Sequence, residues 1–590
     1  MHIKLAETAG FCMGVKRAID GALAEAAHKA AGPIYSLGPL IHNRQAVEML
    51  ERRGIRSVDG IDGIAAGSTI IIRAHGIPPA TRAAIEQAGL RIVDATCPHV
   101  RHAQNTVRKY YRDGWRIVIA GDKDHAEVTG LLGFCDNTGV VVSTPDEARS
   151  IPPDGRICLV AQTTFNESTY DEIAGVLRAG HPEVEVVQTI CRSTEERQRE
   201  VIELCRSADA MVVVGGKHSA NTCRLAEIAR STGVPAFHVE TADELPNDLA
   251  RYQTVGVTAG ASTPHWITNS VIRRLEALGD RSPGIVRFIN RGLRFLTASN
   301  LYTSVGAVAL TYACAALLNG GRRRLDPLSL VIAFCYIFAV YIWNRMAQKQ
   351  LDELNAPPRV AFHTRSPRLL LALTCAAAAV SLVASAVLGL VELLLLFAAY
   401  LIALAYNVPF GPRRLRYRRL KDIPASKDVF TAIAWATVAV VIPAIVRPAA
   451  GAPDLVAADP PPNPALGVVL AAAVAFILAF VRATMFDFTD IQGDRMLGRE
   501  TLPVLMGPHR TRVYLAIITA ALAAALVAGS ITGVFTSLGW WLLPCPAFIL
   551  LVLFPLFQRL IKSDLVCSLV ADGFLVMAGV IALAWRTLAG

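Results

Sequence analysis

Residues 69–78 read TIIIRAHGIP: a β-branched run, then a short polar stretch that ends at Gly and Pro. This order is typical of a strand followed by a loop. It recurs at 116–125, 211–219 and 254–262, each time before a helical segment. Alternation of strand, loop and helix predicts α/β units with mostly parallel strands. In such units ligands collect beyond the carboxyl ends of the strands, where these polar loops lie.

The composition of the chain changes near residue 280. Its 590 residues are too many for one ordinary hydrophobic core. Residues 1–280 mix short apolar runs with charged segments, whereas long stretches of Ala, Leu, Val and Ile dominate the rest. Several of these exceed the roughly 18 apolar residues that suggest a membrane helix. We therefore expect a soluble domain at 1–280, a linker at 281–290 and a membrane domain at 291–590.

Several classes of protein are disfavoured. No GxGxxG follows a strand and no GxxxxGK[ST] occurs, which argues against dinucleotide and Walker-type sites. The net charge of +10 includes arginines between apolar segments, as at 413–421, which favours cytoplasmic loops over nucleic-acid binding. None of the 12 cysteines falls in a CxxC pair, which favours a cytoplasmic or metal-binding role over disulfides. The start, MHIKLAETAGFCMGVKR, lacks the apolar core of a signal peptide, so we expect residues 1–280 in the cytoplasm.

Three cysteines lie in strand-end loops: Cys12, Cys97 and Cys191. Their near-equal spacing suggests one thiolate from each of three similar lobes, converging at a centre. Three thiolates suit an iron–sulfur cluster with one open iron, or a zinc site with an open position. The alternative is that they are buried core cysteines. We expect that role for four others: Cys135, Cys158, Cys205 and Cys223.

Three histidines also lie in separate strand-end loops: His42, His75 and His125. Imidazoles and hydroxyls are suitable donors for a diphosphate in a closed pocket. Further neutral donors stand in loops of the same kind: Ser219, Asn221 and Ser262. No lysine cluster or Mg²⁺-binding carboxylate pair is evident among these loops. The pattern indicates metal-free diphosphate binding, although the two serines equally fit helix N-caps.

Nine motifs in residues 1–280 resemble, in order, those of the 4-hydroxy-3-methylbut-2-enyl diphosphate reductase (LytB) family. They are GFCMGVKRAI, GPLIHN, RAHGIP, DATCPHV, HAEVTG, AQTTF, TICRSTEERQ, KHSANT and TAGAS. The resemblance covers essentially all of the expected soluble domain. Small departures occur at Ala126, Gly216 and His218, where many relatives have Pro, Ser and Asn. None of them removes an expected ligand.

The resemblance implies a three-lobed α/β fold around a [4Fe–4S] cluster held by Cys12, Cys97 and Cys191. It implies that Glu127 takes part in proton delivery and that Thr163 helps to position the substrate. The residues implied to bind the diphosphate are His42, His75, His125, Ser219, Asn221 and Ser262. The implied reaction removes the allylic hydroxyl as water and gives isopentenyl and dimethylallyl diphosphate. A ferredoxin or flavodoxin is the implied electron donor.

The rest of the chain predicts an all-α membrane domain of nine transmembrane helices. The expected spans lie near 293–318, 327–346, 368–388, 391–408, 428–447, 465–485, 511–533, 538–556 and 566–588. With residue 1 in the cytoplasm, the arginine-rich loops fall mostly on the cytoplasmic side, as the positive-inside rule expects. Only Arg322-Arg323-Arg324 violates it. We therefore expect a multi-pass protein of the inner (cytoplasmic) membrane.

Two polar clusters stand at the expected cytoplasmic ends of the second and sixth spans. The first holds Asn344, Arg345, Gln348 and Asp352, and the second, in DFTDIQGDRMLGRETLPVLMG, holds Asp487, Asp490 and Asp494. Carboxylates on two facing helices can hold Mg²⁺ that clamps a diphosphate; a single cluster could equally be interfacial charge. The pair, with the nine spans, resembles the UbiA-type prenyltransferase superfamily. Gln348 stands where that family commonly has Asp, which puts transferase activity in doubt.

Three hypotheses follow. The first is a reductase fused to an intramembrane prenyltransferase that transfers a polyprenyl group. In the second hypothesis the membrane domain is a non-catalytic anchor or scaffold. Gln348 is the residue that distinguishes the first two hypotheses. The third is a structural zinc protein joined to a transporter. Direct channelling between the domains is not implied, since UbiA-type enzymes generally use longer diphosphates than the reductase makes.

Overall fold

The computed structural model describes residues 1–27, 32–41, 43–279, 283–319, 325–347, 362–406, 420–446, 463–496, 499–555 and 564–588. It divides into two compact units, Met1–Arg281 (unit 1) and Ser282–Gly590 (unit 2).

Unit 1 is built on three sheets, each of four parallel strands, which confirms the expected α/β class. The first sheet, ordered β1-β12-β10-β11, joins the two ends of the unit, because His2 pairs with Thr254. Its strands are His2–Leu5, Thr254–Ala259, Ala210–Val214 and Ala236–Val239. The second, β3-β2-β4-β5, comprises Ile55–Val58, Ile34–Leu37, Thr69–Ile72 and Arg91–Asp94. The third, β7-β6-β8-β9, comprises Val140–Val142, Arg116–Ala120, Arg156–Ala161 and Glu183–Val186.

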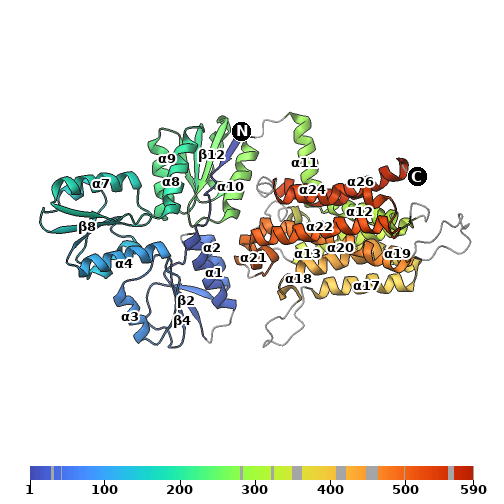
Figure 1. Cartoon of the computed structure of the whole chain (residues 1–590), viewed down its shortest axis with the longest axis horizontal. Coiled ribbons are helices and arrows are strands. Elements are labelled where there is room, and N and C mark those ends of the chain that lie inside the picture. The colour runs from blue at the N-terminus through green and yellow to red at the C-terminus, as the bar shows by residue number, and fades with distance from the viewer. Residues whose placement is uncertain are drawn as a thin grey trace, which may run out of the picture. The chain divides into compact units, whose positions relative to one another are not determined.

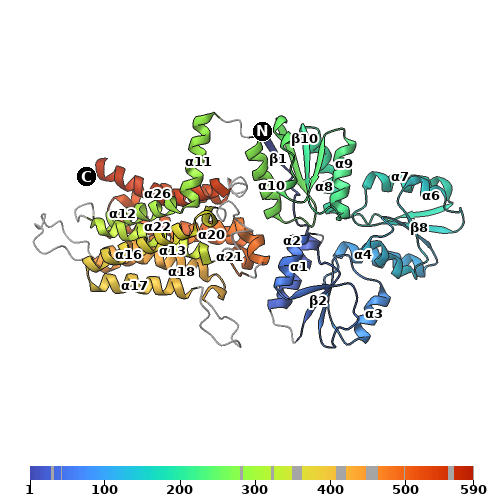
Figure 2. The same cartoon turned by 180° about the vertical axis from the view of Figure 1, so that it is seen from behind.

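Helices connect the parallel strands, as parallel pairing requires. In the first sheet, α8 and α9 cover one face and α10 covers the other (Figures 1 and 2). The α-helices of unit 1 are α1 Met13–Ala27, α2 Arg44–Arg52, α3 Pro79–Gln87, α4 Pro98–Arg112, α5 Ala126–Leu132, α6 Pro145–Arg149, α7 Glu167–Gly180, α8 Arg192–Cys205, α9 Ala220–Ser231 and α10 His265–Leu278. Short 3-10 turns lie at Gly133–Cys135, Ala242–Glu244 and Asn247–Arg251.

Each sheet of unit 1 has an apolar core of its own. Ile70, Ile71 and Ile72 of β4 are fully buried, as their continuous β-branched run suggests. Cys135, Cys158 and Cys205 are buried core residues as expected, whereas Cys223 is only half-buried. The cores fix the sheets, and the loops at the strand ends carry the polar residues.

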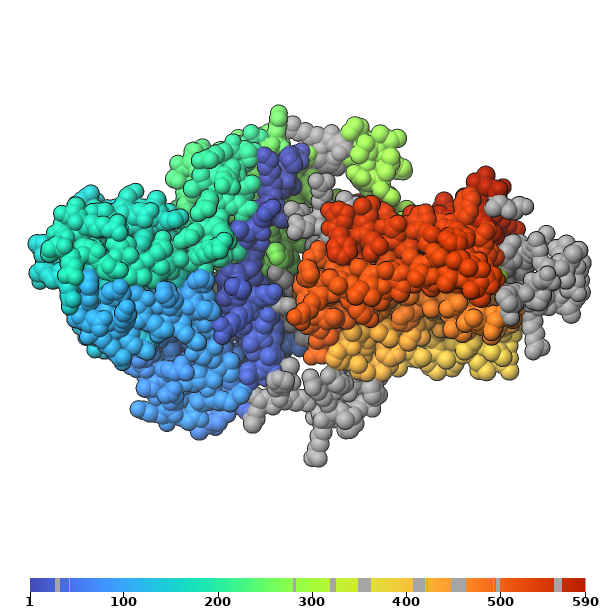
Figure 3. All heavy atoms as spheres, viewed as in Figure 1, coloured from blue at the N-terminus to red at the C-terminus, as the bar shows by residue number. Residues whose placement is uncertain are grey.

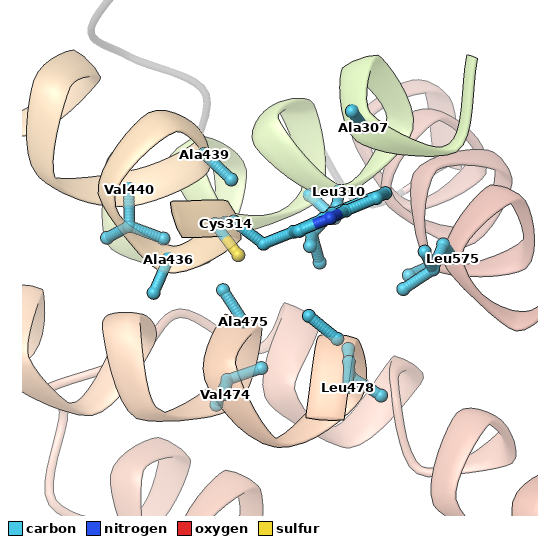
Figure 4. Close-up of a cluster of buried hydrophobic side chains, with 14 of the residues drawn as sticks. Ala307, Leu310, Cys314, Ala436, Ala439, Val440, Val474, Ala475, Leu478 and Leu575 are labelled. Atoms are coloured by element: carbon cyan, nitrogen blue, oxygen red, sulfur yellow. The ribbon is translucent and has the colours of Figure 1, made fainter. Parts of the chain in front are cut away.

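Unit 2 is helical. Its described α-helices are α11 Gly284–Ala298, α12 Leu301–Asn319, α13 Pro327–Ala347, α16 Pro367–Leu388, α17 Leu390–Ala405, α18 Ser426–Ala436, α19 Ile442–Ile445, α20 Pro464–Met496, α21 Leu502–Met506, α22 Pro508–Ile531, α23 Leu538–Trp541, α24 Pro544–Leu553 and α26 Asp564–Leu588. A 3-10 turn, Leu420–Asp422, and a π-helical turn, Thr437–Val441, complete the described elements. Side chains of α12, α18 and its π-helical continuation, α20 and α26 point toward one another in its core (Figure 4).

Seven described helices of unit 2 are long and apolar enough to cross a membrane, which indicates a membrane-embedded region. Nine were expected, and two are not confirmed. The fourth corresponds to the shorter helix Leu390–Ala405, and the eighth to Leu538–Leu553, where Pro544 opens a new helix after α23.

The first expected span, 293–318, was wrong at its start. The chain forms α11, breaks at Ser299 and Asn300, and begins the span only at Leu301. Asn300 adopts a left-handed conformation with φ of 60°, which ends a helix. Arg294 and the polar pair Ser299-Asn300 interrupt the apolar sequence here, and the expected span did not take account of them.

Candidate functional site

Each sheet of unit 1 contributes one cysteine from a loop at the carboxyl end of a strand. Cys12 follows β1, Cys97 follows β5 and Cys191 follows β9. Most of the other expected site residues occupy the same kind of loop: His75 after β4, His125 after β6, Thr163 after β8, Ser219 after β10 and Ser262 after β12. Glu127 and Asn221 lie in the first turns of α5 and α9, the helices that follow β6 and β10. His42 lies outside the described residues.

The three cysteines stand at the N-termini of three helices. Cys97 and Cys191 are the N-cap residues of α4 and α8, and Cys12 directly precedes α1. Cys12 Sγ accepts the backbone N–H of Val15 at 3.4 Å, whereas the side chains of Cys97 and Cys191 make no capping bond to their helices. A helix N-terminus favours negative charge, so all three positions suit thiolates.

Gly14 shows how close two of these sulfurs lie. A Cβ atom at this position would stand 2.9 Å from Cys97 Sγ and 3.8 Å from Cys12 Sγ. Cys191 in turn interacts electrostatically with both of the other cysteines. The structure therefore brings the three sequence-predicted cysteines together from three separate sheets.

The backbone ties each cysteine to a loop that carries an expected substrate residue. Cys12 N–H donates to the Ala261 carbonyl at 3.0 Å, next to Ser262. Cys97 N–H donates to the Ala74 carbonyl at 3.0 Å, next to His75. Cys191 N–H donates to the Thr163 carbonyl at 2.9 Å. These bonds hold the cysteine centre and the polar loops in one frame.

Two of the polar loops bring histidine side chains together. The rings of His75 and His125 meet edge to face, with centroids 5.3 Å apart. His125 Nδ1 accepts the N–H of Glu127 at 3.2 Å, which leaves Nε2 as the protonated nitrogen of the neutral ring. Burial lowers the pKa of His125, so the neutral ring dominates at pH 7.

Three further donors are buried nearby in the first sheet's loops. Ser219 and Ser262 are linked, with their Oγ atoms 3.5 Å apart. Asn221 is 6% exposed, and its amide nitrogen has no hydrogen-bond partner among the described residues. A buried donor without a partner fits an anionic ligand, because such a ligand would satisfy it. Ser219 is also the N-cap residue of α9, but its side chain makes no capping bond there.

Glu127 is a buried carboxyl group held by Thr163. The N–H of Thr163 donates to Glu127 Oε1 at 2.6 Å, and its hydroxyl donates to Oε2 at 2.9 Å. Burial raises the pKa of Glu127 from 4.5 to about 7, although the bonds from Thr163 favour the charged form. A carboxyl group with this pKa carries a proton in a large fraction of molecules at neutral pH.

Unit 2 gathers buried charge where α18 and α20 pack together. Asp487 and Asp494 of α20 are almost fully buried, and so is Asp428 of α18. Lys427 forms an ion pair with Asp487, and Thr484 donates to Asp428 at 3.3 Å. Each of these three carboxylates keeps one buried oxygen with no hydrogen-bond partner among the described residues.

The first polar cluster of unit 2 is described only in part. Asn344 is half-buried in the last turn of α13, and Arg345 donates to Asn300 at 3.3 Å. Gln348 and Asp352 lie outside the described residues, so the pairing of the two clusters stays a prediction. Asp490 is half-buried and accepts from Thr489 at 3.1 Å.

Two family models match the chain, one in each unit. Residues 3–276 match the family described as "LytB protein", and residues 307–566 match the "UbiA prenyltransferase family". The chain is 43% identical over 284 residues to the 4-hydroxy-3-methylbut-2-enyl diphosphate reductase of Alkaliphilus oremlandii, which covers 47% of this chain and 100% of the relative. The chain belongs to this reductase family.

A second relative matches the same part of the chain, and a solved structure matches the other part. The reductase of Clostridioides difficile is 43% identical over 281 residues, again 47% of this chain and 100% of the relative. A solved apo structure of a UbiA homolog from Aeropyrum pernix covers 49% of this chain and 98% of its own, at 20% identity and a TM-score of 0.36. The chain is thus a family reductase joined to a region that matches the UbiA model.

The cysteines of the reductase unit fit the [4Fe–4S] cluster of the family. Among the described residues, no group of three His, Cys, Asp or Glu side chains could hold a single metal ion. A cluster makes a different demand, because each thiolate binds a different iron. Burial raises the pKa of Cys97 and Cys191, which keeps these thiols protonated at neutral pH; a bound iron would replace the proton.

Arg197 is a residue beside this centre that sequence analysis passed over. It is 3% exposed, donates to the carbonyls of Gly10 at 2.7 Å and Ala259 at 2.9 Å, and lies close enough to Cys12 and Cys191 to interact electrostatically. It ties the loop that carries Cys12 to the end of β12. Its position in a charged helical segment, STEERQRE, resembles a solvated helix face, so the sequence carried no signal of burial.

Lys427 and Asp428 are two further site residues that the sequence analysis does not predict, since they stand at the start of the fifth expected span. The available signal was an adjacent pair of opposite charges at the start of an apolar run. Ionisable residues in such places commonly serve function.

Proposed function

We propose that the reductase unit removes the allylic hydroxyl of 4-hydroxy-3-methylbut-2-enyl diphosphate. Two electrons and two protons enter, the carbon–oxygen bond breaks, and the oxygen leaves as water. The products are isopentenyl diphosphate and dimethylallyl diphosphate. A ferredoxin- or flavodoxin-type protein would supply the electrons, since the sequence has no dinucleotide motif. This places the chain in isoprenoid precursor synthesis.

The observation that carries this proposal is the meeting of Cys12, Cys97 and Cys191 at three helix N-termini, tied by hydrogen bonds to polar loops. These three residues would hold the [4Fe–4S] cluster. When bound, the cluster supplies Lewis acidity at its open iron and delivers electrons one at a time.

The side chains of the unit have separate tasks. His75, His125, Ser219, Asn221 and Ser262 donate to the diphosphate, and the neutral His125 directs Nε2–H toward it. His42 joins them by resemblance alone. None of these donors needs a Mg²⁺ ion to bind phosphate oxygens.

Glu127 holds the proton that the departing oxygen takes up. Its buried position keeps this carboxyl group protonated at a pH where an exposed glutamate has lost its proton. Thr163 orients both oxygens through its N–H and hydroxyl, so the proton lies in a fixed direction.

The test of the reductase proposal uses the full chain, purified without oxygen and supplied with a chemically reduced viologen. We expect substrate-dependent oxidation of the viologen and formation of both products. The Glu127→Gln variant should keep its iron and lose turnover. A wild-type protein that contains zinc and no iron would overturn the proposal in favour of a structural zinc site.

For unit 2 we infer Mg²⁺-dependent prenyl transfer, with a polyprenyl diphosphate as donor. Mg²⁺ is held in proteins by one or two carboxylates together with substrate phosphates. Asp487 and Asp494 each have a buried oxygen without a hydrogen-bond partner among the described residues, and such oxygens fit this ion. Asp490 on the same helix, with Asn344 and Asp352 in the first cluster, would complete the site.

The alternative for unit 2 is a non-catalytic anchor or scaffold. Gln348 favours this alternative, because glutamine lacks the carboxylate that the family commonly has at this position. Lys427 favours it as well, because it already forms an ion pair with Asp487. A prenyl-transfer assay with Mg²⁺ separates the two. Activity in the wild type that rises in Gln348→Asp supports transfer. Absence of both Mg²⁺-dependent diphosphate binding and transfer in the two proteins supports the anchor.

A further inference from the structure

Helix α11, Gly284–Ala298, has two chemically different faces. A helix turns 100° per residue, so residues three or four apart share a face. One face is apolar and is formed by Ile285, Val286, Phe288, Ile289, Leu293, Phe295 and Leu296. The opposite face carries Arg287, Arg291 and Arg294, and α11 contains no acidic residue.

The apolar face of α11 is uncovered. Phe288 is 76% exposed, Ile285 71% and Ile289 53%, and no residue of this helix is buried. Space-filling atoms show α11 standing out from the surface of unit 2 (Figure 3). A contiguous apolar surface of this kind on one element marks a site of interaction.

The C-terminal end of α11 is fixed to unit 2. It contacts α12 and α26, and the ring of Phe295 packs edge to face on Phe362, with centroids 5.7 Å apart. The break at Asn300 turns the chain, so α11 runs across the direction of α12, α13, α22 and α26 (Figures 1 and 2). A helix that crosses the spans at their end lies along the plane of the membrane rather than through it.

We propose that α11 lies in the surface of the bilayer that holds unit 2, with its arginines on anionic phospholipid headgroups. The apolar face enters the boundary between headgroups and acyl chains, as in other amphipathic interfacial helices. The helix carries three arginines and no Asp or Glu in its own sequence, and this positive charge complements the negative charge of the lipid surface. α12 follows after two residues, Ser299 and Asn300, which sets α11 at the depth where the first span leaves the membrane.

The continuity with α12 favours lipid over protein as the occupant. If the apolar faces of two copies of α11 packed on each other, the three arginines of each helix would lie near those of the other and repel them. A docking surface for another part of this chain would not call for a row of three cations opposite the apolar face. Both occupants remain outcomes of the experiment below.

The test places a photoreactive benzophenone amino acid at position 289 or 287 of the full chain. The two positions are two residues apart and so point about 160° away from each other around α11, which makes the Arg287 position the matched control for the Ile289 position. Each protein is reconstituted in vesicles of phosphatidylcholine and phosphatidylglycerol, illuminated, digested and analysed by mass spectrometry. We expect phospholipid adducts of the peptide at position 289, in clear excess over position 287. Cross-links from 289 to a second copy or to residues 1–280, in place of lipid, would overturn the proposal.

A second comparison isolates the arginines. In the 289-labelled protein, phosphatidylglycerol should be over-represented among the adducts relative to its share of the vesicle. In the triple variant Arg287→Gln, Arg291→Gln, Arg294→Gln this excess should vanish, while adducts with phosphatidylcholine persist. An equal excess of phosphatidylglycerol with and without the arginines would contradict the assigned role of the charges.

Discussion

Thr163 holds both carboxyl oxygens of Glu127, one through its backbone N–H at 2.6 Å and the other through its hydroxyl at 2.9 Å. Glu127 lies in the first turn of α5, which follows β6, and Thr163 lies in the loop after β8 of the same sheet. The pair joins a buried acid to a residue whose carbonyl also accepts the N–H of Cys191. Proton delivery and the cysteine centre therefore share one rigid strand-end frame.

Burial raises the pKa of Glu127, and the hydroxyl of Thr163 partly opposes this effect. It donates to the charged carboxylate, so its loss in Thr163→Val should raise that pKa. One hydrogen bond to a charged group is worth about 1.5–3 kcal/mol, or roughly one to two pH units. The pH above which kcat/KM falls should therefore move upward by about one unit. Thr164→Val is the matched control, because the hydroxyl of Thr164 accepts a hydrogen bond from the side-chain amide of Gln162 and does not contact Glu127. A profile unchanged in Thr163→Val would contradict this role.

Glu127→Gln should lower kcat by about 10²–10⁴-fold, the usual contribution of a positioned acid.

The same variant should also alter how the stability of the protein depends on pH. The native pKa of about 7 exceeds the ordinary 4.5, so the native protein binds an extra proton between these values. The stabilisation is full below pH 4.5 and is lost as the pH rises through about 7, by an order of 3 kcal/mol.

Thermal unfolding of the reductase unit within the full chain, followed between pH 5 and pH 8, measures this effect. The Glu127→Gln variant should lose less stability over this range than the wild type, because Gln does not titrate. Parallel curves for the two proteins would show that Glu127 is already charged at pH 5.

Much of the reductase unit could be predicted from sequence, because its signals are local. A buried β-branched run such as Ile70–Ile72 identifies a strand, and parallel strands place Cys12, Cys97 and Cys191 at the same kind of edge. Arg197 could not be predicted, because its partners are carbonyls from distant loops, and backbone acceptors leave no mark in a sequence. The start of the first span was wrong for a different reason: the polar pair Ser299-Asn300 marks the end of α11, and Asn300 breaks the helix through its left-handed backbone conformation.

Arg197 should be needed to keep the Cys12 loop in place. Arg197→Met removes both hydrogen bonds and leaves the Gly10 and Ala259 carbonyls without this donor, so we expect less iron and sulfide per chain after anaerobic purification. Arg197→Lys keeps the charge and should recover part of the loss. Arg199→Met, at an exposed position two residues away, is the control and should bind iron like the wild type.

Lys427 offers a test of the carboxylates in unit 2. Its removal in Lys427→Met leaves Asp487 buried without its ion pair, a change that typically costs 3–5 kcal/mol. A divalent cation can replace the lost charge, so the variant should show a larger rise in Tm with Mg²⁺ than the wild type. The double variant Lys427→Met, Asp487→Asn should lose this extra rise. Equal Mg²⁺ responses in all three proteins would count against a cation site.

The central claim is that thiolates from three sheets hold one iron–sulfur cluster with an open iron. Mössbauer spectroscopy of the full chain, grown on ⁵⁷Fe and purified without oxygen, tests it most directly, with iron and sulfide analysis alongside. We predict a [4Fe–4S] spectrum in which one iron differs from the other three, and its loss in Cys97→Ala. A Cys97→Ala protein with the same spectrum and full iron content, or a wild-type protein without a cluster, would contradict the account.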